Sequence, residues 1–116
     1  MKEKCVLIVD DDYIILVLAK IFFESHGLEV DCAENGEEAL CKIQEKPFFM
    51  MITDFNMPGM DGLELAAKAR GIAPLMPIFM ASGNASPEIR RLAEEIGIAK
   101  VFAKPLCFET ILMAMG

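Results

Sequence analysis

The sequence of 116 residues contains no tryptophan, one tyrosine, one histidine and only four cysteines. Cys5, Cys32, Cys41 and Cys107 form no C-x-x-C pair and have no histidine at metal-ligand spacing, which argues against a zinc site. We expect all four to behave as small buried hydrophobic residues. No apolar run reaches the roughly 18 residues of a membrane span, so we expect no membrane contact and a cytoplasmic location.

Basic residues are also scarce, since 11 Lys and Arg stand against 18 Asp and Glu and the net charge is −7. Nucleic-acid-binding domains normally carry a basic face, so direct binding to nucleic acid is not expected. Hydrophobic residues make up 54% of the chain, which favours a folded protein with buried strands. The length fits one domain over residues 1–116.

Short apolar runs alternate with segments of helical period. The predicted strands cover residues 5–9, 28–32, 48–53, 77–81 and 101–103, and their aliphatic and β-branched content is typical of buried parallel strands. Helices are predicted over 13–25 and 108–115, and from N-cap residues Asn35, Asp61 and Ser86. This alternation predicts an α/β fold: a doubly wound (βα)5 sandwich with a five-stranded parallel sheet.

Two groups of apolar residues are expected in the core. Helical periodicity places five residues of the first helix largely on one side: Ile14, Leu16, Val17, Ile21 and Phe22. Methionines commonly fill gaps in cores, which explains Met50, Met51, Met57, Met60, Met76 and Met80 without a metal-binding role. His26 precedes Gly27 at the predicted end of the first helix, where both residue types are common.

Residues capable of chemistry follow the predicted strands, at the edge where parallel sheets bind ligands. They are Asp10, Asp11 and Asp12 after the first strand, Asp54 after the third, Ser82 after the fourth and Lys104 after the fifth. Converging carboxylates repel one another unless a cation joins them, and oxygen ligands suit Mg²⁺ or Mn²⁺. Asp54 could attack a phosphoryl group, with the Lys104 ammonium and the Ser82 hydroxyl contacting its oxygens.

Two acidic residues near this edge have simpler explanations. Asp12 opens the first helix, where a carboxylate interacts favourably with the helix dipole. Asp61 is close to Asp54 in the chain, but its N-cap position explains it fully. Arg90 and Arg91 on the fourth helix are interpreted as part of a solvated face, with a binding patch as the less favoured alternative.

Four motifs together resemble the response regulator receiver family of two-component signalling: Val9-Asp10-Asp11, Asp54 to Gly62 (DFNMPGMDG), Ser82-Gly83 and Lys104-Pro105. The resemblance spans nearly the whole chain and implies a flavodoxin-like, CheY-like fold. It implies that Asp54 accepts a phosphoryl group from a sensor histidine kinase or phosphotransfer protein in a Mg²⁺-dependent reaction. Such a domain is a signalling phosphoacceptor and catalyses only its own phosphorylation and dephosphorylation.

The resemblance also implies roles for single residues. Asp11 would ligate the metal directly, Asp10 would act mainly through metal-bound water, and the Asn56 backbone carbonyl would be a further ligand. Asp54 would complete the metal site, Ser82 and Lys104 would contact the phosphoryl group, and the Lys104-Pro105 bond would be cis. Asn56 and Asn84 would tune the access of hydrolytic water.

Output would pass through a downstream protein or an effector domain outside this chain, and a homodimer could form through the face from the fourth to the fifth helix. The sequence departs from the family at two positions that matter for output. Ser82 stands where threonine is usual, and the hydroxyl is kept. Val101 stands where an aromatic switch residue is expected, while strand alternation points Phe102 to the opposite face. The departure at Val101 puts the usual aromatic switch in doubt, whereas function is expected to be retained with Ser82.

Two other classes share parts of this pattern. Asp10 and Asp12 form the D-x-D of a haloacid-dehalogenase-like phosphatase, but no acidic pair follows a late strand and the Asp54 loop would be unexplained. A flavodoxin-like flavin binder shares the fold alone, and an acidic triplet would repel the flavin phosphate.

Overall fold

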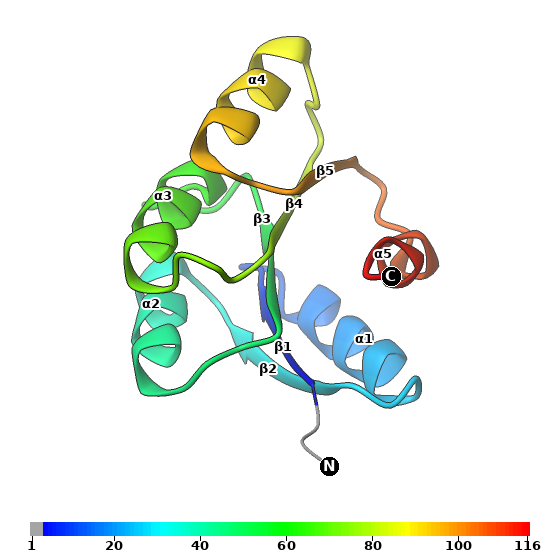
Figure 1. The fold of residues 1–116 in the computed structure, drawn as a ribbon. Helices are drawn as coiled ribbons and strands as arrows, with labels where there is room; N and C mark the ends of the chain where they lie inside the picture. The colour runs from blue at the N-terminus through cyan, green and yellow to red at the C-terminus, as the bar shows by residue number, and fades with distance from the viewer. Residues whose placement is uncertain (1–3) are drawn as a thin grey trace.

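Five parallel strands form one sheet in the computed structural model, which describes residues 4–116, with the order β2-β1-β3-β4-β5 (Figure 1). The strands are β1 (Cys5–Val9), β2 (Glu29–Ala33), β3 (Met50–Asp54), β4 (Ile78–Ser82) and β5 (Lys100–Ala103). The helices are α1 (Tyr13–Glu24), α2 (Gly36–Glu45), α3 (Gly62–Ile72), α4 (Pro87–Ile96) and α5 (Phe108–Ala114). The predicted α/β fold is confirmed, with strand ends displaced from the prediction by two residues at most.

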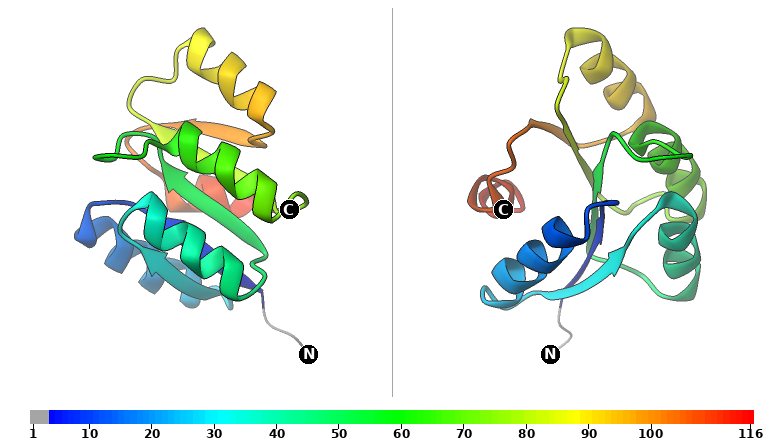
Figure 2. Two further views of the ribbon diagram at one scale, coloured as in Figure 1. Left: turned by 90° about the vertical axis from the view of Figure 1, so that its left-hand side faces the viewer. Right: turned by 180° about the vertical axis from the view of Figure 1, so that it is seen from behind.

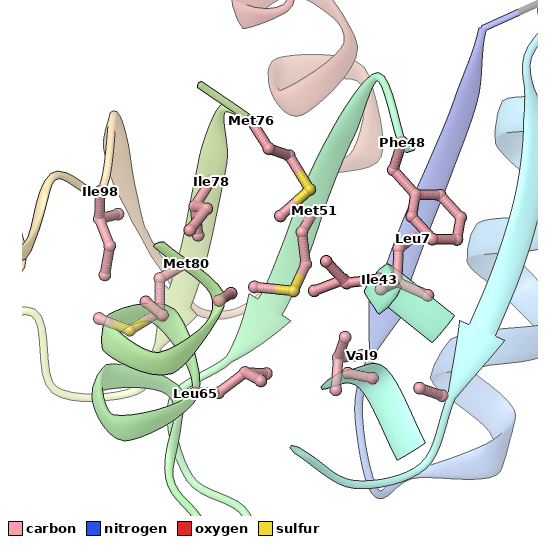
Figure 3. Packing of buried hydrophobic residues seen from close by; sticks show 14 of the residues in the cluster. Leu7, Val9, Ile43, Phe48, Met51, Leu65, Met76, Ile78, Met80 and Ile98 are labelled. Carbon is pink, nitrogen blue, oxygen red and sulfur yellow. The ribbon is translucent and has the colours of Figure 1, made fainter. Parts of the chain in front are cut away.

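Helices cover both faces of the sheet, with α1 and α5 on one side and α2, α3 and α4 on the other (Figure 2). Strand alternation divides the core accordingly. Leu7 and Val9 point toward α2 and α3, whereas Val6 and Ile8 belong to the cluster on the α1 and α5 side. Figure 3 shows the first cluster, in which Met51 and Met80 interdigitate with aliphatic side chains. Five of the six methionines assigned to the core are buried, and Met60 packs against the core from its edge.

Local signals in the sequence set where α2, α3 and α4 begin. Each predicted N-cap side chain accepts a hydrogen bond from the backbone N–H three residues on: Asn35 from Glu38 at 2.8 Å, Asp61 from Glu64 at 2.8 Å and Ser86 from Ile89 at 3.2 Å. Gly97 ends α4 with a φ of 99°, a left-handed conformation that glycine adopts without steric cost. The predicted caps are therefore confirmed.

The predicted inward face of α1 is correct for Leu16, which is buried, and for Phe22, which packs against the core, but wrong for Ile14 and Ile21. Leu16, Ala19 and Phe23 face the sheet, while Ile14 and Ile21 are 65% and 63% exposed. This stretch is apolar almost all round, so its periodicity does not mark one face. Packing against the sheet and α5 selects the buried stripe instead.

Two of the four cysteines also contradict the prediction of burial. Cys5 is buried in β1 and Cys32 is half-buried in β2, but Cys41 and Cys107 are exposed. Cys41 lies on the outer side of α2, whose inner side carries Ala39 and Ile43. Cys107 occupies the N-cap position of α5, outside the core.

The predicted end of α1 is confirmed by a local contact. His26 lies just beyond the helix, and its ring Nδ1 is 2.9 Å from the carbonyl oxygen of Phe22.

Across residues 4–116, the longest helix has 12 residues, and none has the length and apolar character that a membrane crossing requires.

Candidate functional site

Three carboxylates meet at the carboxyl edge of the sheet. β1 and β3 are neighbours with Val9 beside Thr53, so Asp10 and Asp54 leave the sheet side by side. Asp10, Asp11 and Asp54 each offer an oxygen atom within 4.8 Å of the others. Asp10 and Asp54 are buried and Asp11 is exposed, which gives a hard-oxygen site open on one side.

Asp10 is held in place by its own turn. Its Oδ1 accepts a hydrogen bond from the Asp12 backbone N–H at 2.9 Å. Burial raises the pKa of Asp10 from 3.8 to about 6, and the negative charge of Asp54 adds to this effect. The Asp12 N–H and the Lys104 ammonium act in the opposite direction. Burial and the charge of Asp54 outweigh these two interactions, so the nearby positive charge does not fully offset the cost of ionising Asp10.

Lys104 brings one positive charge to Asp54. Its Nζ lies 2.6 Å from Asp54 Oδ1. The contact lacks hydrogen-bond geometry, and this buried oxygen accepts no hydrogen bond from any other described residue. We therefore treat it as a charge–charge contact, which leaves the oxygen able to accept further bonds. The Lys104-Pro105 peptide bond is cis, as the resemblance implied.

An open pocket of about 450 Å³ lies over these residues. It brings together five of the six predicted site residues: Asp10, Asp11, Asp54, Asn56 and Lys104. Asn56 is exposed in the loop after β3. Asp12 lines the pocket as well, but its side chain caps α1 by accepting from the Ile14 N–H at 3.0 Å, as predicted.

Ser82 is the sixth predicted residue, and its hydroxyl bonds to the loop that follows β4. Its side chain is fully buried at the end of β4. Its Oγ donates to the Asn84 carbonyl oxygen at 2.9 Å and accepts from the Asn84 N–H at 3.0 Å. Ser82 therefore stands next to the site, with its only proton engaged by the following loop.

Gly62 supports the site in a way that sequence analysis did not identify. A Cβ atom at this position would lie 2.5 Å from the Asp54 carbonyl oxygen and 2.9 Å from Phe55 Cα. The start of α3 can therefore rest on the backbone of the acceptor residue only if position 62 has no side chain. The available signal was the glycine directly after the Asp61 N-cap.

Four residues of β5 and α4 were also the subject of predictions: Val101, Phe102, Arg90 and Arg91. Val101 packs with the α3 and α4 side of the core, and Phe102 lies on the opposite side, where its ring meets Phe79 edge-on at 5.3 Å. The predicted opposite orientation is confirmed. Arg90 and Arg91 are both exposed, as expected of a solvated face, although the Arg90 side chain also bonds to the backbone.

Comparison with known families gives a match over residues 6–115 to the model of the response regulator receiver domain. The chain belongs to the response regulator receiver family. Receiver domains are signalling domains of two-component systems, and the predicted CheY-like fold is confirmed. The match decides against the phosphatase and flavin-binding alternatives.

Curated relatives carry the receiver domain in proteins of very different size. The chain is 34% identical to the response regulator receiver protein CpdR of Brucella abortus, over 88% of this chain and 85% of CpdR. It is 35% identical to the uncharacterized transcriptional regulatory protein YesN of Bacillus subtilis, but spans only 31% of YesN. It is 34% identical to the peroxide stress-activated histidine kinase mak3 of Schizosaccharomyces pombe, of which it spans 5%.

Solved structures show the same architecture. The chemotaxis protein CheY4 of Vibrio cholerae superposes with a TM-score of 0.92 at 33% identity, covering 98% of this chain and 97% of CheY4. A response regulator protein from Burkholderia pseudomallei has a TM-score of 0.91 at 28% identity, covering 98% of this chain and 67% of that chain. The Burkholderia structure is described with a phosphorylated aspartic acid, a calcium ion and citrate.

Proposed function

We propose that this receiver domain accepts a phosphoryl group on Asp54 in a reaction that depends on Mg²⁺ or Mn²⁺, and thereby changes its contacts with an output partner. The observation that carries the proposal is the setting of Asp54. Its carboxylate is buried beneath an open pocket, lies 2.6 Å from an ammonium group and is flanked by two further carboxylates. A phosphorylated aspartic acid in the Burkholderia relative supports the same chemistry.

The proposed reaction uses Asp54 as the nucleophile. One of its oxygen atoms forms a bond to the phosphorus of the donor, while the donor's P–N or P–O bond breaks and its electron pair leaves with the donor. The Lys104 ammonium offsets the negative charge on the transferring oxygens. Ser82 can donate to one of those oxygens after its hydroxyl leaves Asn84. Hydrolysis of the acyl phosphate returns the free carboxylate.

The residues present fit a divalent cation with oxygen ligands. The carboxylates of Asp10, Asp11 and Asp54 would hold it, together with the Asn56 backbone carbonyl. When bound, the cation supplies positive charge that neutralises the clustered carboxylates and the phosphoryl oxygens. Two features favour this assignment: the raised pKa of Asp10, and the buried Asp54 oxygen that accepts no hydrogen bond from residues 4–116.

The proposed donor is a sensor histidine kinase or a phosphotransfer protein. An apolar stripe on α1 begins next to the pocket, with Ile14, Leu18 and Ile21 at 65%, 49% and 63% exposure. Such a stripe suits docking of a helical protein beside Asp54. Replacing Ile14 and Leu18 with serine is expected to abolish transfer from the phosphorylated partner while acetyl phosphate still reacts. Equal loss with both donors would contradict docking on α1.

Output would pass to a downstream protein or to an effector domain, as in a transcriptional regulator such as YesN. A homodimer through the face formed by α4, β5 and α5 is one possible form of this output. Sedimentation of the chain with and without beryllium fluoride and Mg²⁺ checks it. The proposed dimer predicts a doubling of mass with the reagent, and a monomer under both conditions would exclude it.

Intact-mass spectrometry tests the phosphoacceptor. Incubation with acetyl phosphate and Mg²⁺ is expected to add one base-labile phosphoryl group, and Asp54→Asn is expected to abolish the adduct. Asp61→Asn is a matched control, because asparagine caps a helix as well as aspartate, and it should keep the adduct. An adduct that persists in Asp54→Asn, or its absence from the unmodified chain with both acetyl phosphate and phosphoramidate, would refute the proposal.

A further inference from the structure

Arg90 connects two parts of the backbone, one that follows Ser82 and one that precedes Lys104. Its Nε donates to the Ala85 carbonyl oxygen at 3.2 Å, and its Nη1 donates to the Val101 carbonyl oxygen at 3.2 Å. Ala85 lies in the loop between β4 and α4, whereas Val101 lies in β5. The neighbouring Arg91 is different, because it pairs with Glu95 within its own helix. One guanidinium thus joins the loop of residues 83–86 to the edge strand.

The same loop holds the Ser82 hydroxyl. Ser82 Oγ donates to the Asn84 carbonyl oxygen and accepts from the Asn84 N–H. A hydroxyl has a single proton, so Ser82 cannot donate toward Asp54 while it donates to Asn84. The conformation of the loop therefore decides whether Ser82 is available to the site.

Arg90 bonds to the backbone of Val101, the position at which an aromatic switch residue is expected. The Val101 side chain is short and packs into the core, and Phe102 is held on the other face against Phe79. Both Arg90 hydrogen bonds are at the long end of the normal range and lie on an exposed side chain. Contacts of this strength can hold one loop conformation and still be released by a local change.

We propose that Arg90 is a positioning residue that holds the loop of residues 83–86 in the conformation in which Ser82 bonds to Asn84, and that it releases Ala85 when Ser82 turns to a phosphoryl group on Asp54. This inference rests on the proposed function of Asp54. Since coupling is reciprocal, loss of the Arg90 contacts favours phosphorylation, and phosphorylation loosens Arg90.

Two measurements on the full chain test this coupling. In ¹⁵N-labelled protein, the Arg90 Nε–H resonance is expected to shift when beryllium fluoride and Mg²⁺ occupy the site as a phosphoryl mimic. In Ser82→Ala the mimic should still perturb residues around Asp54, but the Arg90 resonance should no longer respond. A purely structural role for Arg90 predicts no response in either protein, and that result would overturn the inference without the need for any Arg90 variant.

The second measurement is the rate at which acetyl phosphate forms the Asp54 adduct. Arg90→Ala is expected to raise this rate about three- to tenfold, from the loss of two modest hydrogen bonds. Arg91→Ala, the matched control, should change it less than twofold. Equal rates for the two variants, with a normal Asp54 adduct, would overturn the role of Arg90 and leave the phosphoacceptor intact. Absence of an Asp54 adduct in the unmodified chain would instead overturn both.

Discussion

The buried carboxylate of Asp10 makes a quantitative prediction about stability. Burial raises its pKa from 3.8 to about 6, so keeping Asp10 ionised at pH 7 without a divalent cation costs the folded protein about 3 kcal/mol. Asp10→Asn removes that charge, and the amide oxygen can still accept from the Asp12 N–H. The variant is therefore expected to be more stable than the unmodified chain at pH 7 in EDTA, by about 1–3 kcal/mol.

The sign of the pH dependence follows from the raised pKa. A carboxyl group whose pKa is higher in the folded state contributes most stability below its unfolded pKa of 3.8, and this contribution is lost as the pH rises through about 6. The advantage of Asp10→Asn should therefore shrink to about 0.5 kcal/mol at pH 4. Taking the difference between the two proteins at each pH cancels the titration of the other groups.

The difference in stability between the two proteins can be measured by urea unfolding followed by far-ultraviolet circular dichroism. This signal does not depend on tryptophan, which the chain lacks. The free energy of unfolding falls by about 1–3 kcal/mol for each 1 M of urea, so the expected gain in stability moves the midpoint of urea unfolding by about 1 M at pH 7. Asp12→Asn is the control, because its exposed cap is equally well made by asparagine. Mg²⁺ should stabilise the unmodified chain more than Asp10→Asn, so that the unmodified chain becomes the more stable of the two. A variant that is less stable in EDTA at pH 7, or a difference that does not change with pH, would refute the reasoning.

Two further predictions concern the stability of the fold. Gly62→Ala is expected to destabilise the domain by about 1–3 kcal/mol, because its Cβ would collide with the backbone of Asp54. Gly71→Ala in the same helix meets nothing within 4 Å and should stabilise it by about 0.5–1 kcal/mol. Arg70→Ala should lower the free energy of unfolding by about 2 kcal/mol, because Arg70 donates to four backbone carbonyls. Lys68→Ala loses only an exposed ion pair and should lower it by less than about 0.5 kcal/mol. Urea unfolding checks all four variants, and equal effects within either pair would contradict the account.

The fold was predictable because its boundaries are marked locally. The N-caps at Asn35, Asp61 and Ser86 and the stop at Gly97 each act within a few residues, so their effect can be read along the chain. The inward face of α1 was only partly predictable, because apolar residues surround that helix. Which stripe is buried there depends on the sheet and on α5, which lie far away in sequence.

The membership of the site was predictable for a different reason. The carboxyl ends of parallel strands meet at one edge, so Asp10, Asp54 and Lys104 had to converge once the fold was known. The orientation of the Ser82 hydroxyl and the Arg90 bonds to carbonyl oxygens could not be predicted. Bonds from side chains to distant backbone atoms leave no periodic pattern, since every residue offers a carbonyl.

The side chain of Asp54 is proposed to become the acyl phosphate itself. Reduction with borohydride after incubation with acetyl phosphate and Mg²⁺ converts an acyl phosphate to an alcohol, and peptide sequencing by mass spectrometry then locates it. We expect homoserine at position 54 in the treated protein and unmodified aspartate there when acetyl phosphate is omitted. Homoserine at position 10 or 11, or unmodified aspartate at position 54 in a protein that carries the phosphoryl adduct, would contradict it.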